Sequence, residues 1–212
     1  MQTNLTDITL LLDRTGSMAS IASDVIGGVN TFIEAQKKAE GRANFTLVQF
    51  DSQDPQEVVF DAVDIESVDG LKDYLPRAST PLLDALGLCI VRTGERLAAI
   101  DESTRPAKVI FVVFTDGLEN ASKEYNKDQV RDMVNHQKNT YKWDFIFMGA
   151  NIDTFAQAGA VGIDAATSAD VDMNNFADAL MATAENVAHY RATGHKASLS
   201  YTPEQRKRMK SK

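Results

Sequence analysis

Residues 5–17 read LTDITLLLDRTGS, and this stretch decides the fold. Its first part, residues 5–12, is apolar with β-branched threonines among the leucines, which predicts a buried strand that ends at Asp13. Residues 108–114, KVIFVVF, form a second run that is apolar at nearly every position and ends next to Asp116. Continuous apolarity is typical of strands that are covered on both faces, as in parallel sheets.

Outward from these two runs, strand patterns alternate with helical ones. Apolar residues at helical spacing predict helices over residues 21–40, 81–100, 127–140, 154–158 and 173–190. Further strands are expected over residues 43–50, 57–60 and 143–148, and at an edge near Ile163.

The acidic residues 61–73 are expected to be irregular, with one helical turn near Leu71. Residues 43–50 and 57–60 are predicted to pair antiparallel around the Asp54-Pro55 turn. The alternation predicts an α/β fold: a doubly wound, mostly parallel sheet flanked by helices, with one antiparallel edge strand.

Composition narrows the class of protein. The chain has 212 residues, of which 43% are hydrophobic and 25% charged, as in a globular protein with one sizeable core. Its single cysteine, Cys89, excludes an intrachain disulfide, and it is expected to be a buried small residue. No stretch reads as a signal peptide or a membrane span, so the expected location is the cytoplasm, without membrane contact.

Charge is distributed unevenly along the chain. The net charge is −8, which argues against general binding of nucleic acid or anionic membranes by the main body. Residues 191–212 hold seven Lys or Arg and one acid, Glu204, so this end carries +6 and the remainder −14. We therefore expect a domain over residues 1–192 and a basic, mobile tail over residues 193–212. This tail is either a solvated end or an electrostatic arm for nucleic acid or an acidic partner.

Oxygen-bearing side chains follow the predicted strand ends. In doubly wound sheets, ligands bind beyond the carboxyl ends of the strands, where the strand order reverses. Two carboxylates and three hydroxyls are expected there: Asp13, Thr15, Ser17, Thr80 and Asp116. With no histidine or cysteine among them, this set suits Mg²⁺, Mn²⁺ or Ca²⁺ rather than zinc or copper.

The order and loop placement of these residues resemble a known family. Asp13-x-Thr15-Gly16-Ser17, then Ser79-Thr80-Pro81-Leu82, then Thr115-Asp116-Gly117 are similar to the metal-ion-dependent adhesion site of von Willebrand factor A domains. The resemblance covers about residues 5–190 and points to the intracellular members found in bacteria and bacteriophages. The family pattern is Asp-x-Ser-x-Ser, and here Thr15 replaces the first serine.

The resemblance implies a Rossmann-like fold and roles for each residue of the site. Ser17, Thr80 and Thr15 would bind the ion directly, with Mg²⁺ the expected ion and Mn²⁺ or Ca²⁺ the alternatives. Asp13 and Asp116 would hold bound waters. An ion with mostly neutral ligands favours a carboxylate from outside, so the implied partner is an unidentified protein that donates an Asp or Glu. The implied function is protein interaction without catalysis.

Two other functions stay open from the residues. One is a Mg²⁺-dependent phosphatase of the haloacid-dehalogenase kind with Asp13 as nucleophile, although Thr15 stands where that chemistry needs a second acid. The other is a nucleic-acid accessory protein that uses the basic tail. The sequence indicates no oligomeric state.

Several acids and one amide beside these motifs have two readings each. Asp84 is either an outer-shell residue of the site or a solvated acid at a helix start. Glu119 and Asn120 are either rim residues or ordinary loop residues, and Asp51 is read as a turn residue. Four acids are either a second cation site or a solvated acidic surface: Asp61, Asp64, Glu66 and Asp69.

Overall fold

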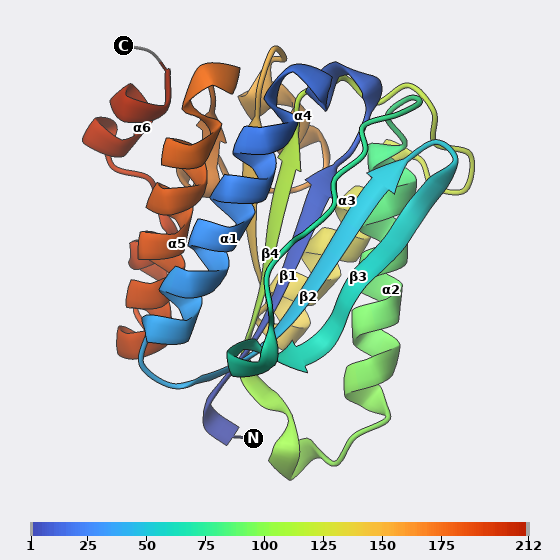
Figure 1. Cartoon of the computed structure of the whole chain (residues 1–212). Coiled ribbons are helices and arrows are strands. Elements are labelled where there is room, and N and C mark those ends of the chain that lie inside the picture. Colours follow the sequence, from blue (N-terminus) through green and yellow to red (C-terminus); the bar gives the residue numbers. More distant parts are fainter. Residues whose placement is uncertain (1, 211–212) are drawn as a thin grey trace.

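The two apolar runs lie side by side at the centre of a six-stranded sheet (Figure 1). The computed structural model describes residues 2–210. Its strand order is β3-β2-β1-β4-β5-β6. The strands are β1 (Gln2–Asp13), β2 (Arg42–Asp51), β3 (Asp54–Asp64), β4 (Pro106–Thr115), β5 (Asp144–Gly149) and β6 (Ser168–Asp170). All neighbours pair parallel except β2 and β3, which confirms the predicted fold class with its antiparallel edge.

Helices cover both faces of the sheet (Figure 1). One face packs against α1 (Ala22–Lys38) and α5 (Phe176–Thr193), and the other against α2 (Leu82–Ala98), α3 (Lys127–His136) and α4 (Thr154–Ala160). Side chains alternate between the faces along each strand. In β1, Leu10 and Leu12 join the core under α1 and α5, while Leu11 joins the core under α2. This two-sided burial explains why both runs are largely apolar instead of alternating.

An extended segment, residues 68–80, crosses the face of the sheet beside α1, and we call it the strap. Its side chains Val68, Leu71 and Tyr74 are buried at every third position. Residues 68–80 form no regular helix or strand, in line with the prediction that this stretch is irregular, although residues 61–64 belong to β3. The helical turn predicted near Leu71 is wrong: a 3₁₀ turn lies at Ile65–Ser67 instead. A glycine with φ of +92°, Gly70, sits beside Asn30, whose side-chain amide exchanges two hydrogen bonds with the backbone of Leu71.

Several predicted elements have other boundaries. The turn predicted at Asp54-Pro55 lies at residues 52–53, because Asp54 and Pro55 already belong to β3. The edge strand expected near Ile163 lies at Ser168–Asp170, because Ile163 is instead buried in the core under α2, α3 and α4. The helix predicted over residues 127–140 ends at His136, and a π-helical turn, Gln137–Tyr141, follows it. This turn closes at Lys142, whose φ of 62° is incompatible with continued helix.

The C-terminal segment differs from the mobile tail that the sequence predicted. Residues 196–199 form a 3₁₀ turn, and α6 (Pro203–Lys210) packs beside α5 (Figure 1). Leu199, Tyr201 and Met209 are buried, which compensates for the loss of chain entropy on ordering this segment. The last two residues of the predicted tail, Ser211 and Lys212, lie outside the described residues.

The basic side chains of this segment are largely engaged with the domain itself. Arg206 donates to the carbonyls of Ser168, Ala165 and Ala166 at the β6 edge. Arg208 pairs with Glu185, and Lys210 pairs with Asp170. Lys196 pairs with Asp144, so four of the five Lys and Arg of residues 193–210 are engaged in contacts within the protein. Among the described residues, no helix is long and apolar enough to cross a bilayer.

Candidate metal centre

The ends of β1 and β4 bring two separate motifs together. In the parallel register Leu12 lies opposite Phe114, so Asp13 and Thr115 are neighbours at the carboxyl edge. The Thr115 hydroxyl donates to Asp13 Oδ2 over 2.6 Å. Strand order reverses at this point, since β1 lies between β2 and β4. The site therefore occupies the switch point where α/β sheets bind their ligands.

The loop after β1 turns back across the edge and presents its hydroxyls to Asp116. The backbone N–H of Thr15 donates to Asp13 Oδ1 over 2.7 Å. Ser17 Oγ donates to Asp116 Oδ1 over 2.7 Å and lies 3.1 Å from Thr15 Oγ1. Thr15 Oγ1 is 3.5 Å from the same Asp116 oxygen. Four of the five predicted residues are thus linked by hydrogen bonds.

The fifth residue, Thr80, reaches the site from the end of the strap. A Cβ atom added to Gly117 would lie 3.0 Å from Thr80 Oγ1, so the hydroxyl lies directly against the residue that follows Asp116. A glycine at this position lets the two loops approach closely. The structure therefore gathers all five predicted side chains at one edge of the sheet.

Burial shapes the electrostatics of this site. Asp13 is fully buried and Asp116 nearly so, whereas Ser17 is exposed at the surface. Burial raises the pKa of Asp13 to about 6 against the opposing effect of its hydrogen bonds with Thr115 and Thr15, and the nearby Asp116 raises it further. Burial also raises the pKa of Asp116. Burial and the proximity of the two carboxylates disfavour their ionised forms. A cation bound between them would stabilise those forms, so the site suits a cation.

One oxygen of the site lacks a partner. Asp116 Oδ2 is buried, and no hydrogen-bond donor among the described residues reaches it. Buried carboxylate oxygens are normally satisfied by donors or by metal ions. An oxygen-only donor set with an unsatisfied carboxylate oxygen fits a hard divalent cation.

The other acidic residues of the described chain do not form a second metal site built from clustered His, Cys, Asp or Glu side chains. Within residues 2–210, no three or more His, Cys, Asp or Glu side chains cluster in a way that could hold a metal ion. The acids of residues 61–69 are therefore a solvated surface. The predicted site itself relies on hydroxyls beside its two carboxylates.

The raised pKa of Asp13 predicts how the metal-free protein responds to pH. The folded state binds this proton more tightly than the unfolded chain, whose carboxyl has a pKa near 3.8. The contribution of Asp13 to the free energy of unfolding should therefore be greatest below pH 4 and should fall by about 3 kcal/mol as the pH rises through 6. Urea denaturation in chelator across this range measures it.

In Asp13→Asn this fall should disappear, so the variant gains stability relative to wild type as the pH rises. Asp24→Asn, at an exposed acid of α1, is the matched control and should keep the wild-type pH profile. Equal pH dependence in wild type and Asp13→Asn would contradict the assignment of a buried, destabilising charge to Asp13.

Beside the site lies a buried ion-pair network that the sequence did not reveal. The Arg14 guanidinium donates to Asp51 Oδ2 over 2.6 Å and 3.0 Å and to Gln49 Oε1 over 3.2 Å, and it pairs with Glu57. Arg77 of the strap contacts the same oxygen of Asp51. Asp51 is the turn residue that the sequence suggested, since its Oδ1 accepts from the backbone N–H groups of Gln53 and Asp54. It is also fully buried and binds these two arginines through Oδ2. Its place at the carboxyl end of β2 is the signal that could have marked it.

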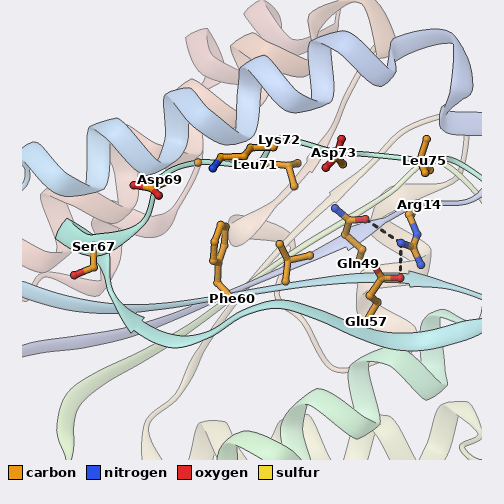
Figure 2. Close-up of a pocket in the computed structure, with 12 residues that line it drawn as sticks. Arg14, Gln49, Glu57, Phe60, Ser67, Asp69, Leu71, Lys72, Asp73 and Leu75 are labelled. Atoms are coloured by element: carbon orange, nitrogen blue, oxygen red, sulfur yellow. Dashed lines mark hydrogen bonds and ion pairs between the residues drawn. The ribbon is translucent and has the colours of Figure 1, made fainter.

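The network forms one end of a groove of about 440 Å³ between the strap and β3 (Figure 2). Figure 2 shows Arg14 joined to Gln49 and Glu57 at this end, with Phe60 on the floor and Leu75 at the mouth. Leu75 is exposed, while its neighbour Tyr74 is buried and donates its hydroxyl to the carbonyl of Asp13. The strap thereby ties the groove to the loop that begins at Asp13.

Three residues near Thr80 had two readings each from the sequence, and for Asp84 the structure excludes one of them. Asp84 is buried rather than solvated, and it accepts hydrogen bonds from the loop after β4. Glu119 and Asn120 bind the first turn of α2 and the backbone of Thr80. None of them contacts the five site residues by a side chain–side chain hydrogen bond among the described contacts, so they act on the site from outside.

Comparison by sequence identifies no relative: no protein-family model and no curated protein matches the chain. Comparison of structures finds proteins of the same fold. The von Willebrand factor domain of the type V pilus tip protein Mfa5 from Porphyromonas gingivalis has a TM-score of 0.60 at 12% identity, over 92% of this chain and 97% of that one. Manganese-loaded TRAP protein from Plasmodium vivax has a TM-score of 0.56 at 17% identity, over 84% and 72%.

Proximal thread matrix protein 1 from the mussel byssus, in a form with a zinc-occupied MIDAS motif, has a TM-score of 0.57 at 12% identity. That match covers 88% of this chain and 46% of the mussel protein, so the chain spans less than half of that relative's length. A von Willebrand factor type A protein from Catenulispora acidiphila is similar at 13% identity and a TM-score of 0.56. At such low identities the likeness establishes architecture: this chain has the Rossmann-like fold of von Willebrand factor A domains.

Proposed function

We propose that this protein is a non-catalytic interaction module that binds a divalent cation at Asp13, Thr15, Ser17, Thr80 and Asp116, and through it a carboxylate of a partner protein. The observation that carries the proposal is the gathering of these oxygens at the switch point, with Asp116 Oδ2 unpartnered among the described residues. Solved structures of the same fold whose names record zinc in a MIDAS motif or bound manganese support it.

The roles of the residues follow from their chemistry. Ser17, Thr15 and Thr80 offer neutral hydroxyl oxygens as direct ligands, and Asp13 and Asp116 supply negative charge and orient bound waters. A divalent cation with few anionic ligands supplies Lewis acidity for an incoming carboxylate. Because Ser17 is exposed, a partner's Asp or Glu could reach an ion held by this hydroxyl. Mg²⁺ is the expected ion, and the cytoplasm the expected location.

Hydrolysis receives less support from the same geometry. A phosphatase with Asp13 as nucleophile needs a general acid two residues on, and the hydroxyl of Thr15 is too weak an acid for that role. Burial raises the pKa of the Cys89 thiol to about 12, so it is no nucleophile at neutral pH. Binding of nucleic acid by the tail is disfavoured because Arg206, Arg208 and Lys210 contact the domain.

Calorimetric titration tests the first half of the proposal. Wild-type protein should bind one Mg²⁺ or Mn²⁺, and Ser17→Ala should weaken binding markedly because it removes a direct ligand. Ser20→Ala, at an exposed serine of the same 3₁₀ turn, is the matched control and should bind like wild type. Absence of binding to wild type at millimolar ion overturns the proposal.

Affinity capture tests the second half. Wild-type protein with Mg²⁺ should retain a partner that chelator and Ser17→Ala release, whereas Ser20→Ala retains it. A partner that stays bound in chelator and with Ser17→Ala would show that the interface does not run through the ion.

A further inference from the structure

Sheet hydrogen bonds do not hold the loop that carries Asp116. Pairing of β4 with β5 ends at Thr115 opposite Gly149, and residues 117–125 continue without strand or helix. Thr80 likewise lies outside any regular element, at the junction between the strap and α2. The relative position of Thr80 and Asp116 must therefore be set by contacts between the two loops.

Asp84 fastens the loop to α2 from the helix side. Its carboxylate accepts hydrogen bonds from three successive backbone N–H groups, those of Lys123, Glu124 and Tyr125, over 2.7, 2.9 and 2.8 Å. Its own backbone N–H donates to Ser122 Oγ over 3.0 Å. Asp84 is only 5% exposed, so these bonds form away from bulk water and are of the strong, charge-assisted kind.

Glu119 fastens the same two segments from the loop side. Glu119 Oε2 accepts from the backbone N–H of Leu83 in the first turn of α2 over 2.9 Å and from Ser122 Oγ over 2.8 Å. Glu119 Oε1 accepts from the backbone N–H groups of Ala121 and Ser122. Asp84 of α2 thus binds the loop, and Glu119 of the loop caps the first turn of α2.

Asn120 connects this arrangement to the ligand itself. Its side-chain oxygen accepts from the backbone N–H of Thr80 over 2.9 Å, and its backbone N–H donates to the Thr80 carbonyl over 3.0 Å. Both backbone polar groups of Thr80 are therefore held by one residue of the Asp116 loop. We call Asp84, Glu119 and Asn120 the clamp.

We propose that the clamp positions the Thr80 hydroxyl opposite Asp116 for metal binding, with Asp84 as its principal positioning residue. The inference rests on the proposed function of the site. Residues of this kind, which hold a ligand without touching the ion, typically change metal affinity by about 10- to 100-fold when they are replaced. Mg²⁺ is the ion most sensitive to such displacement because it demands near-ideal octahedral geometry.

The test is the affinity of the full chain for Mn²⁺ alone, measured by calorimetry. Asp84→Asn keeps the size of the side chain but replaces one acceptor oxygen with a donor that faces backbone N–H groups, and it should weaken Mn²⁺ binding at least about 10-fold. Glu124→Gln, at an exposed acid of the same loop, is the matched control and should bind like wild type.

A double-mutant cycle separates positioning from general stability. In a Thr80→Ala background the hydroxyl is absent, so Asp84→Asn should cause little further loss of Mn²⁺ affinity. A structural defect would instead lower affinity in both backgrounds alike. Asn120→Ala, which removes the acceptor for the Thr80 N–H, provides the same cycle if Asp84→Asn fails to fold.

Each result decides the proposal. Weaker binding that vanishes in the Thr80→Ala background supports it. Wild-type affinity in Asp84→Asn, or an equal loss with and without the Thr80 hydroxyl, overturns the clamp while the metal site stands. If wild-type protein binds no Mn²⁺, the proposed function itself fails.

Discussion

Replacing Asp51 with alanine is expected to lower the free energy of unfolding by about 3–5 kcal/mol. Asp51 is fully buried, and its carboxylate accepts from Arg14, Arg77 and the backbone N–H groups of Gln53 and Asp54. Without it the Arg14 guanidinium stays buried next to Gln49 and keeps only the ion pair with Glu57. Removing one member of a buried pair leaves an uncompensated charge, which is why the expected loss is large.

Denaturation by urea at neutral pH measures this loss. Glu57→Gln is the matched control, because Glu57 contacts the same two arginines but is 42% exposed, and its replacement should cost about 1 kcal/mol or less. A loss in Asp51→Ala as small as in Glu57→Gln would contradict the view that Asp51 organises this end of the sheet.

Acid should erase the difference between wild type and Asp51→Ala. Burial alone would raise the pKa of Asp51, but hydrogen bonds from Gln53, Arg77 and Arg14 outweigh it and hold the pKa below its usual value. A lowered pKa contributes stability above the unfolded value that is lost as pH falls through the folded one. Below that pH, wild type and Asp51→Ala should converge in stability.

Asp116→Asn is expected to weaken Mn²⁺ binding by about 100-fold. Among the substitutions at residues that are not proposed direct ligands, this effect should be larger than that of Asp84→Asn. Asp116 accepts from Ser17, lies within reach of Thr15, and has a second oxygen that is buried and unpartnered among the described contacts. The substitution removes the negative charge and points an amide N–H group into the site, where it opposes a cation.

Titration with Mn²⁺ and with Mg²⁺ measures the change. Asp170→Asn is the matched control for the loss of one negative charge at the same edge of the sheet, because Asp170 ends β6, two strands away from β4, and pairs with Lys210. If both variants lose affinity equally, the effect is long-range electrostatics rather than the specific place of Asp116 in the site.

Much of the architecture can be predicted from local patterns. Residues 5–12 and 108–114 are apolar on both faces of the chain, and only a covered parallel strand buries such runs without leaving an apolar face in water. Asp13 and Asp116 end these runs, so their meeting at the carboxyl edge follows once the two strands are neighbours. The metal-binding role of the site residues stays a prediction that titration must test.

The sequence predictions that differ from the structure, near Ile163 and over residues 196–210, have a common physical cause. Ile163 is apolar and β-branched, and the sequence pattern cannot distinguish an edge strand from a buried loop residue of the same type. Residues 196–210 are polar and basic by composition. Their few apolar side chains, Leu199, Tyr201 and Met209, are buried against α5 and β6, and this outweighs the expectation of mobility.

The acids outside the motif show most clearly what local sequence patterns cannot predict. Asp51 ends a strand pattern, Asp84 stands among apolar residues at a helix start, and Glu119 lies in a loop. An acid at any of these positions is normally solvated. In the fold, Asp51 meets arginines that lie 37 residues before it and 26 after it, and Asp84 meets N–H groups from 39 to 41 residues away. No local pattern encodes partners at that separation.

By itself the sequence determined the alternation of strands and helices, the central pair of buried strands and the oxygen-bearing residues at their ends. These features depend on side-chain periodicity over a few residues, which is local. Only the tertiary structure decided which acids are buried, what neutralises them and where Thr80 stands relative to Asp116. Burial and charge pairing depend on segments that are distant along the chain, and they exist only after the sheet and its helices have packed.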